Sequence, residues 1–318
     1  MQQTSTSGRA APRRSSAFPK RFTASRRARE ARVAYLFMLP ALLFFLTFQI
    51  YPLFKAFQIS LHDWAIMPGA RSEFLGFANY TRALADPIFW TALRNTVLYT
   101  VVTVPAQMAL AMLLALVLHH ITWGRVFFRT LYYLPVITSW VVVSLLFKFL
   151  FHSQGGLVNY VLKDGLHLVA DYIPWLQNAG TALLVVMLLG IWKGIGWSMV
   201  IFLAALQGIP HDLHEVAAID GANRRQRFWN VTLPLMRPTL VFVLVMLVIG
   251  GFNVFLSVFL ITGGGPMHRT ESILTYMYGQ AFDFLELGYG SALSFLLAGI
   301  IFTLSFLQIR FFRRPVDA

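Results

Sequence analysis

Cysteine is absent from this 318-residue chain, and charged residues make up only 12% of it. Without cysteine there is no disulfide framework, no Cys-based metal site and no thiol nucleophile. An ordinary soluble domain is about 25% charged and roughly 45 to 50% apolar, whereas this chain is 57% hydrophobic with a mean hydropathy of +0.64. The shortage of charge indicates an integral membrane protein.

Acidic residues are missing from every long apolar segment. Six segments have the length and composition of spanning helices, each of which needs roughly 20 residues. They are residues 35–59, 96–118, 131–151, 181–206, 239–262 and 289–309, and none of the 13 Asp and Glu residues falls within them. Ion-coupled carriers and membrane-embedded hydrolases generally need an ionisable group inside the membrane, so the sequence disfavours both. Lys148 and Lys193 are candidates for such a group, but lysines near helix ends usually extend to the interface, and we favour that interpretation.

Basic residues are abundant at one side of the predicted helices. Residues 1–32 hold nine Lys and Arg and a single acid, Glu30, without apolar periodicity, so they predict a disordered basic tail; a transit peptide has a similar composition. Counting over alternate loops places eighteen of the 26 Lys and Arg on the N-terminal side and four on the other. This asymmetry predicts that both termini are cytoplasmic. Because topology accounts for most of the net charge of +13, we expect no nucleic-acid partner.

Local features complete the expected architecture. Pro40 and Pro52 predict a kink or an early end in the first helix, and residues 156–172 predict a short helix outside the membrane. The glycine runs 194–196 and 263–265 lack the Lys-Ser or Lys-Thr of a phosphate-binding loop. The histidines show no metal-binding spacing, so we expect no metal site and treat the pairs at 119–120 and 211–214 as solvated.

One charged stretch interrupts the apolar pattern, EVAAIDGANRRQRFWNVTLPL at 215–235. Asp212 followed by Glu215 has capping-box spacing, which predicts a helix starting at about Leu213. Ala217 with Gly221 and Ala218 with Ala222 form a face almost without side chains. Gly221 either ends this helix or marks a close approach, and a second amphipathic helix should follow, with Pro234 as its stop. Residues alone favour a hairpin at the membrane surface.

The same stretch resembles the EAA motif of ABC importer permeases: Glu-Ala-Ala, three residues, Gly, nine residues, Ile, one residue, Leu-Pro. Glu215, Ala217, Gly221, Leu233 and Pro234 match at every spacing, while Val216 and Val231 replace the family's Ala and Ile. The sequence EVAAIDGA at 215–222 resembles the form of this motif in the carbohydrate-uptake subfamily. Segments 74–96, 128–139, 262–282 and 287–294 also resemble that subfamily, so the likeness covers about residues 33–314.

The resemblance implies an all-α integral membrane protein with six transmembrane helices and the ABC type I importer permease fold. Its domains would be the tail 1–32, the permease domain 33–314 with a cytoplasmic coupling loop at 209–237, and a C-terminal tail 315–318. The chain would be a multi-pass subunit of the cytoplasmic membrane and no enzyme, binding no cofactor itself. The implied partners are a second homologous permease, two ATPase subunits carrying ATP and Mg, an extracytoplasmic solute-binding protein and membrane lipid.

Two sets of functional residues follow. The resemblance implies that the coupling loop docks on an ATPase through Glu215, Ala217, Ala218, Asp220, Gly221, Leu233 and Pro234, although Glu215 could instead only cap its helix. A solute pathway should be wetter than a lipid-facing surface, and its candidates are Trp140, Ser144, Trp192, Trp197, Asn253, Ser257 and Ser291. Such residues also serve as packing contacts or interfacial anchors. We expect import of a sugar or sugar-like solute, with glycerol 3-phosphate or a glycerophosphodiester as the alternative and an ion-coupled carrier as a further one.

Overall fold

The computed structural model describes residues 22–65, 71–121 and 123–312. They divide into two compact units, residues 1–56 and 57–318, which are described separately. The predicted C-terminal tail at 315–318 and the tail residues 1–21 lie outside the described residues.

The first unit is helical from its first described residue. Helix α1 (Phe22–Phe45) continues through a π-helical turn, η1 (Leu46–Ile50), into α2 (Tyr51–Ser60). The prediction of a disordered tail up to residue 32 is therefore wrong for residues 22–32, where the sequence is rich in Ala and Arg, both good helix formers. Neither proline ends the helix. Pro40 lies inside α1, and the π-helical turn stands directly before Pro52.

The second unit contains twelve further α-helices among the described residues. They are α3 (Ala78–Ala85), α4 (Pro87–His120), α5 (Arg125–Ile137), α6 (Trp140–Leu150), α7 (Leu157–Asn159), α8 (Ala179–Gln207), α9 (His211–Ile219), α10 (Arg224–Arg227), α11 (Leu233–Phe252), α12 (Leu256–Ile261), α13 (Ile273–Tyr278) and α14 (Leu287–Phe312). The π-helical turns η2 (Tyr160–Gly165), η3 (Phe228–Thr232) and η4 (Gly279–Asp283) extend α7, α10 and α13. Strands β1 (His62–Asp63) and β2 (Glu73–Phe74) form one small antiparallel pair, with His62 opposite Phe74.

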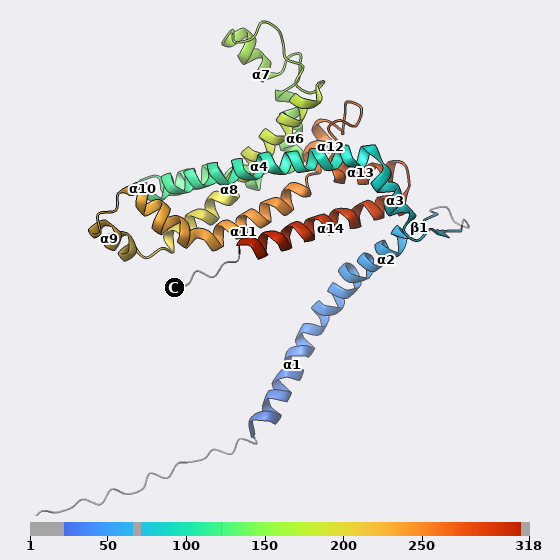
Figure 1. The fold of residues 1–318 in the computed structure, drawn as a ribbon, viewed down its shortest axis with the longest axis horizontal. Coiled ribbons are helices and arrows are strands. Elements are labelled where there is room, and N and C mark those ends of the chain that lie inside the picture. The colour runs from blue at the N-terminus through green and yellow to red at the C-terminus, as the bar shows by residue number, and fades with distance from the viewer. Residues whose placement is uncertain (1–21, 66–70, 122, 313–318) are drawn as a thin grey trace, which may run out of the picture. The chain divides into compact units, whose positions relative to one another are not determined.

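The core of this unit is built from long apolar helices packed side by side. Helix α4 lies along α8 and α11, and α11 lies along α14 (Figure 1). Phe89, Ile273 and Leu293 fill the core near the start of α4, whereas Leu118 and Phe202 fill it near the end of α4. A third cluster, which includes Tyr99 of α4 and Val186 and Leu189 of α8, lies between α4, α6, α8 and α12.

Five helical segments are long and apolar enough to cross a membrane: Ala31–Ser60, Pro87–His120, Ala179–Gln207, Arg224–Ile261 and Leu287–Phe312. A sixth is possible if α5 and α6 form one broken span, because the pair is bent by 91° at the residues between them. The count of six is thus met only with a broken third span, and a single helix over 131–151 is wrong. Thr138 and Ser139, between the two halves, are extended, with ψ of 150° and 133°.

The fifth span also differs from its predicted form. The chain is helical from Arg224 through η3 into α11, so Pro234 does not stop a helix but stands in the first turn of α11. Proline cannot donate a hydrogen bond to the preceding turn, and that preceding turn is the π-helical turn η3. The predicted segment 239–262 is itself interrupted after Phe252, and α12 resumes at Leu256. Between α6 and α8, the expected helix in 156–172 is confined to α7 and η2.

Candidate functional site

A cavity of ≈ 220 Å³ lies between the midpoints of α4 and α8. Its wall comes from the broken third span, α4, α8 and α11. The lining residues are Tyr99, Thr103, Gln107, Val136, Trp140, Gly190, Lys193, Gly194, Trp197, Leu247, Gly250 and Gly251. Aromatic faces, a hydroxyl and an amide therefore share one small cavity within otherwise apolar helices.

Helix α4 supplies one polar side of the cavity. Tyr99, Thr103 and Gln107 follow one another at intervals of four residues, which places them on a single face. Two glycines of α8 make room for them: a Cβ on Gly190 would lie 2.1 Å from Tyr99 Oη, and one on Gly194 would lie 2.1 Å from Gln107 Oε1. Any larger residue would displace these polar groups, so the glycines are required by the close approach of the two helices.

Lys193 supports the break between α5 and α6. It lies near the middle of α8 and is only 3% exposed. Its ammonium donates hydrogen bonds to the carbonyl oxygens of Pro135 at 2.6 Å and Thr138 at 2.7 Å. These carbonyls belong to the last turn of α5 and the residue after it, where a cation also stabilises the negative end of the helix dipole. The expectation that Lys193 extends to the interface is wrong, because its partners are the backbone groups that the break leaves free.

The aromatic wall of the cavity is attached to the same lysine. Trp140 begins α6, and the Lys193 ammonium lies 5.0 Å from the centre of its ring. Cation–π contacts at this range are attractive. The lysine therefore connects the bend of the third span to the position of one cavity-lining ring. Lys148, by contrast, is exposed on α6.

The predicted pathway residues separate into two groups. Trp140 and Trp197 line the cavity. Ser144 and Ser257 are buried elsewhere in the helix packing, Ser291 is half-buried on α14, and Trp192 is 44% exposed with its ring against Phe147. Asn253 and Ser257 do not share one helix, because the chain breaks between α11 and α12, and exposed Asn253 donates to the Ile249 carbonyl.

Four polar lining residues were missed: Tyr99, Thr103, Gln107 and Lys193. The first three could have been found, because polar residues at intervals of four inside an apolar segment mark a polar face. The signal for Lys193 was a charge in the middle of a predicted span, where an ionisable residue is by default a candidate functional residue.

The predicted coupling loop at 209–237 contains α9, α10 and η3. Helix α9 has Pro210 at its N-cap and no side-chain cap, so both the predicted start at Leu213 and the capping role of Glu215 are wrong. Glu215 instead lies 3.0 Å from His211 Nδ1. Pro210 rather than Asp212 precedes the helix, since its extended backbone (ψ 133°) leads directly into the first turn.

Gly221 ends α9. Its φ is +82°, and the amides of Gly221 and Ala222 donate to the carbonyls of Ala218 and Ala217 at 3.1 Å and 2.9 Å. These two bonds form a Schellman motif, which favours glycine at this position. Nothing lies within 4 Å of a Cβ placed on Gly221, so the turn, and not close packing in the chain, requires the glycine. A capping box that sequence reasoning missed, Asn223 with Gln226, begins α10.

The proposed docking residues are mostly open to their surroundings. Glu215, Ala218, Asp220 and Gly221 are exposed, and Ala217 is half-buried. Leu233 is half-buried and Pro234 exposed at the start of α11. The α9 turn therefore presents a small-residue surface that the described part of this chain does not cover.

At the opposite end of α4, polar side chains are bonded to one another. Asp86 caps α4 by accepting from Ile88 N at 2.8 Å, and it accepts from the hydroxyls of Tyr276 and Tyr289. Burial raises the pKa of Asp86, but these hydrogen bonds outweigh it, so the pKa lies below its usual value of 3.8. Burial and the bond to Asp86 raise the pKa of Tyr276.

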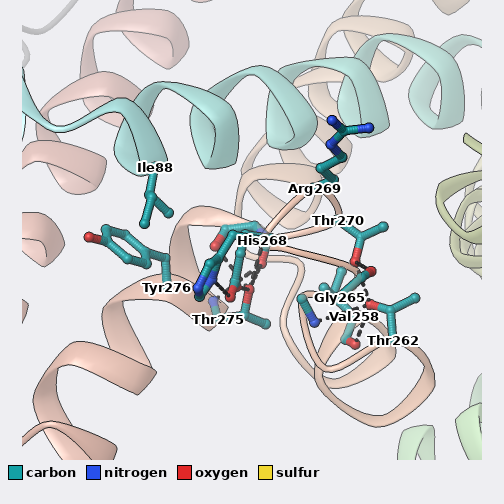
Figure 2. Close-up of polar contacts among 12 residues, drawn as sticks. Ile88, Val258, Thr262, Gly265, His268, Arg269, Thr270, Thr275 and Tyr276 are labelled. Atoms are coloured by element: carbon teal, nitrogen blue, oxygen red, sulfur yellow. Dashed lines mark hydrogen bonds and ion pairs between the residues drawn. The ribbon is translucent and has the colours of Figure 1, made fainter. Parts of the chain in front are cut away.

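The loop after α12 is held in the same region (Figure 2). Thr270 Oγ1 lies within hydrogen-bond distance of Gly265 O at 2.5 Å and of Thr262 Oγ1 at 2.9 Å, which ties the two ends of the loop together. Asn95 of α4 donates to the carbonyls of Arg269 and Glu271 at 2.9 Å and 3.0 Å. The side-chain amide of Asn95 thus fixes the loop to α4 by donating to two backbone carbonyls of the loop.

Comparison with known families gives a match over residues 107–316, to the family described as the binding-protein-dependent transport system inner membrane component. The match covers most of the chain. The protein belongs to this family. It is accordingly a permease of an ABC importer and a multi-pass protein of the cytoplasmic membrane, as the coupling-loop motif indicated.

Similar proteins extend the match over the permease domain. The probable ABC transporter permease YurN of Bacillus subtilis is 35% identical over 88% of this chain and 96% of its own. The lactose transport system permease LacF of Rhizobium radiobacter is 33% identical, covering 79% and 84%. The sn-glycerol-3-phosphate transport system permease UgpA of Agrobacterium fabrum is also 33% identical, covering 80% and 85%.

The fold of the permease has a solved counterpart. It matches a chain of a bacterial alginate ABC transporter, solved in complex with an alginate-bound periplasmic protein, with a TM-score of 0.80 over 93% of this chain and 99% of that one. The two are 23% identical. The predicted all-α permease fold is thereby confirmed.

Proposed function

We propose that this permease moves a sugar or sugar-like solute through the cavity between α4 and α8 by ATP-driven alternating access. The observation that carries the proposal is the cavity lining, which combines aromatic rings (Tyr99, Trp140, Trp197) with the hydroxyl of Thr103 and the amide of Gln107. Sugars present hydroxyl groups at their edges and C–H groups on their faces, so they need hydrogen-bonding partners together with apolar rings. The 33% identity to a lactose permease supports the same substrate class.

The energy for this movement would come from other chains. A permease with one coupling loop per chain needs a second permease, because each of two ATPase subunits requires a dock. ATP and Mg would bind those ATPases, and a solute-binding protein would deliver the solute from outside. Alternating access then becomes a population shift set by the different affinities of these partners for the inward-open and outward-open forms. Both termini and the coupling loop would face the cytoplasm, which the distribution of arginines supports.

Docking of the ATPase is assigned to α9 and the turn that follows it. Exposed Glu215 would contact the partner, while Ala217, Ala218 and Gly221 would let it approach closely and Asp220 would order the turn. Leu233 and Pro234 would connect this movement to α11, since they start that helix. The exposure of this surface supports the proposal, because a docking surface must be open before its partner arrives.

Glycerol 3-phosphate is the second candidate. The identity to a glycerol-3-phosphate permease favours it, as does the positive charge of Lys193 in the cavity wall. Against it stands the bonding of that ammonium, which donates to Pro135 O and Thr138 O and also lies 3.3 Å from Thr138 Oγ1. A phosphate would have to compete with both carbonyls, so the neutral solute remains the first candidate.

Two tryptophans on α8 provide the test. Trp197 lines the cavity, whereas Trp192 lies outside it. Uptake of labelled sugar by proteoliposomes holding the full complex and the binding protein should fall roughly tenfold in Trp197→Ala, because a lost ring contact costs about 0.5–1.5 kcal/mol beyond its buried area. Trp192→Ala should change uptake less than twofold. Equal effects of both variants would show that the cavity is not the pathway, and uptake of glycerol phosphate alone would favour the second candidate.

A further inference from the structure

A second and larger pocket lies where α4 and α8 end. Its volume is ≈ 870 Å³, and it is enclosed by the ends of these helices together with α9, α10 and η3. The lining residues are Leu116, Val117, His119, His120, Ile121, Leu206, Ile209, His211, His214, Arg224, Arg227, Phe228 and Thr232. This pocket lies at the opposite end of α4 from Asp86, on the side predicted to be cytoplasmic.

The wall of this pocket combines two chemistries. Val117, Ile121, Leu206 and Phe228 supply apolar surface from the ends of the helices. Two guanidinium groups and four imidazoles supply positive or potentially positive groups, and no carboxylate is among the lining residues. Helix α9 also carries Asp212 and Glu215, both outside the lining, and Glu215 already contacts His211. The pocket is therefore apolar along the membrane helices and cationic toward the loop.

The short helix α10 contributes two arginines to the lining of the pocket. Arg224 and Arg227 are three residues apart and so lie on one side of the helix, and both line the pocket, whereas Arg225 between them does not. The capping box of Asn223 and Gln226 fixes this turn. Arg227 Nε is buried and has no hydrogen-bond partner within the described residues, which is a donor that an anion could satisfy.

Other ligands fit this surface less well. The histidines form no group able to hold a metal ion in the part of the chain that the structure describes. A free phosphate would use the arginines but leave the apolar wall without a partner. A molecule with an anionic head and acyl chains uses both, and basic pockets at the ends of membrane helices bind such head groups.

We propose that this pocket is a binding site for an anionic phospholipid. The phosphate is held by Arg224 and Arg227, and an acyl chain lies along Val117, Ile121 and Leu206 toward the membrane. Because α9 and α10 both border the pocket, the bound lipid fills the space between the coupling loop and the helices that it moves. The site concerns lipid and is independent of which solute the permease carries.

Lipid retention by the purified complex tests this assignment. The complex is reconstituted in phosphatidylcholine discs with an equal part of phosphatidylglycerol, extracted in mild detergent and examined by native mass spectrometry. The unaltered complex should retain phosphatidylglycerol in preference to phosphatidylcholine. The double variant Arg224→Gln, Arg227→Gln should lose retention on the order of thirtyfold, because each basic residue near an anionic head group contributes about 1 kcal/mol.

Matched variants separate this site from general attraction to the membrane. Arg225→Gln removes the same charge from the same helix and should retain lipid normally, and Arg224→Lys with Arg227→Lys should retain most of it, which shows that the fold is intact. Equal loss in Arg225→Gln would overturn the assignment, as would displacement of the lipid by inorganic phosphate. Loss of the ATPase subunits with lipid retained would assign the arginines to a protein contact instead.

Discussion

The two ends of helix α4 are built in opposite ways. At its start, Asn95 is bonded to a residue 174 positions later in the chain and Asp86 to a residue 203 positions later, and their partners are largely buried. Beyond its other end, the α9 turn has only local bonds, and most of its side chains are exposed. The first region is stabilised within the chain, whereas the second is left open. This openness is what the proposed docking of another subunit on the α9 turn requires.

The strongest effect is expected at the open end. Gly221→Asp places a side chain where the proposed ATPase approaches, and at a φ of +82°. We expect the variant permease to insert into the membrane while ATP hydrolysis stimulated by loaded binding protein falls to background, since docking of the ATPase requires a bare surface there. ATPase assays on the reconstituted complex measure this.

Gly155→Asp is the matched control for backbone strain. Gly155 also has a positive φ, +78°, with nothing near a Cβ, but it lies in the loop between α6 and α7. Normal coupling in Gly155→Asp with lost coupling in Gly221→Asp would isolate the docking contact. Full stimulation of ATP hydrolysis in Gly221→Asp would refute the docking role.

A smaller effect is expected at the closed end. Asn95→Ala removes both hydrogen bonds that fix the loop after α12 to α4, and leaves two carbonyls without that partner. The cost is about 1–3 kcal/mol of stability, which thermal unfolding of the detergent-solubilised protein would report as a lower Tm. Exposed Asn230→Ala should leave Tm unchanged; an unchanged Tm in Asn95→Ala would mean that the loop is held by other contacts.

The smallest effect is the pH dependence of Asp86. Its pKa is lower in the folded protein than the usual 3.8, so the folded state binds its proton more weakly than the unfolded state does. The stabilisation is therefore complete above about pH 4 and is lost as the pH falls through the folded pKa. Unfolding measured from neutral pH down to acid should show this loss, and Asp86→Asn should remove that part of the dependence. Identical acid profiles in both proteins would exclude a role for this carboxylate.

The sequence predicted a helix correctly where apolar residues form a long uninterrupted segment. The apolar segments at 96–118 and 181–206 correspond to α4 and α8. The break in the third span could not be predicted in the same way. Pro135 is compatible with a continuing helix, and the groups released by the break are satisfied by Lys193, 55 residues after Thr138. A contact of this kind depends on which helices lie together, which a window of sequence does not contain.

The prediction of a capping box at the start of α9 was wrong for a related reason. Asp212 and Glu215 have the spacing of a capping box, but Pro210 sets the helix start one residue before Asp212. This shift places Asp212 in the first turn instead of at the cap, and Glu215 contacts His211 instead of completing a capping box. The spacing of Asp212 and Glu215 therefore predicted that a helix exists here. The position of Pro210 determined where that helix starts, and so which contacts the two carboxylates make.

The buried ammonium of Lys193 has an electrical consequence. It is a fixed positive charge near the midpoint of α8, far from either end of that helix. Moving one elementary charge across a whole membrane changes its energy by about 2.3 kcal/mol per 100 mV. Any tilt or shift of α8 along the membrane normal during transport would carry this charge through part of that voltage drop. The balance between the inward-open and outward-open forms should therefore depend on the membrane potential, even though the energy source is ATP.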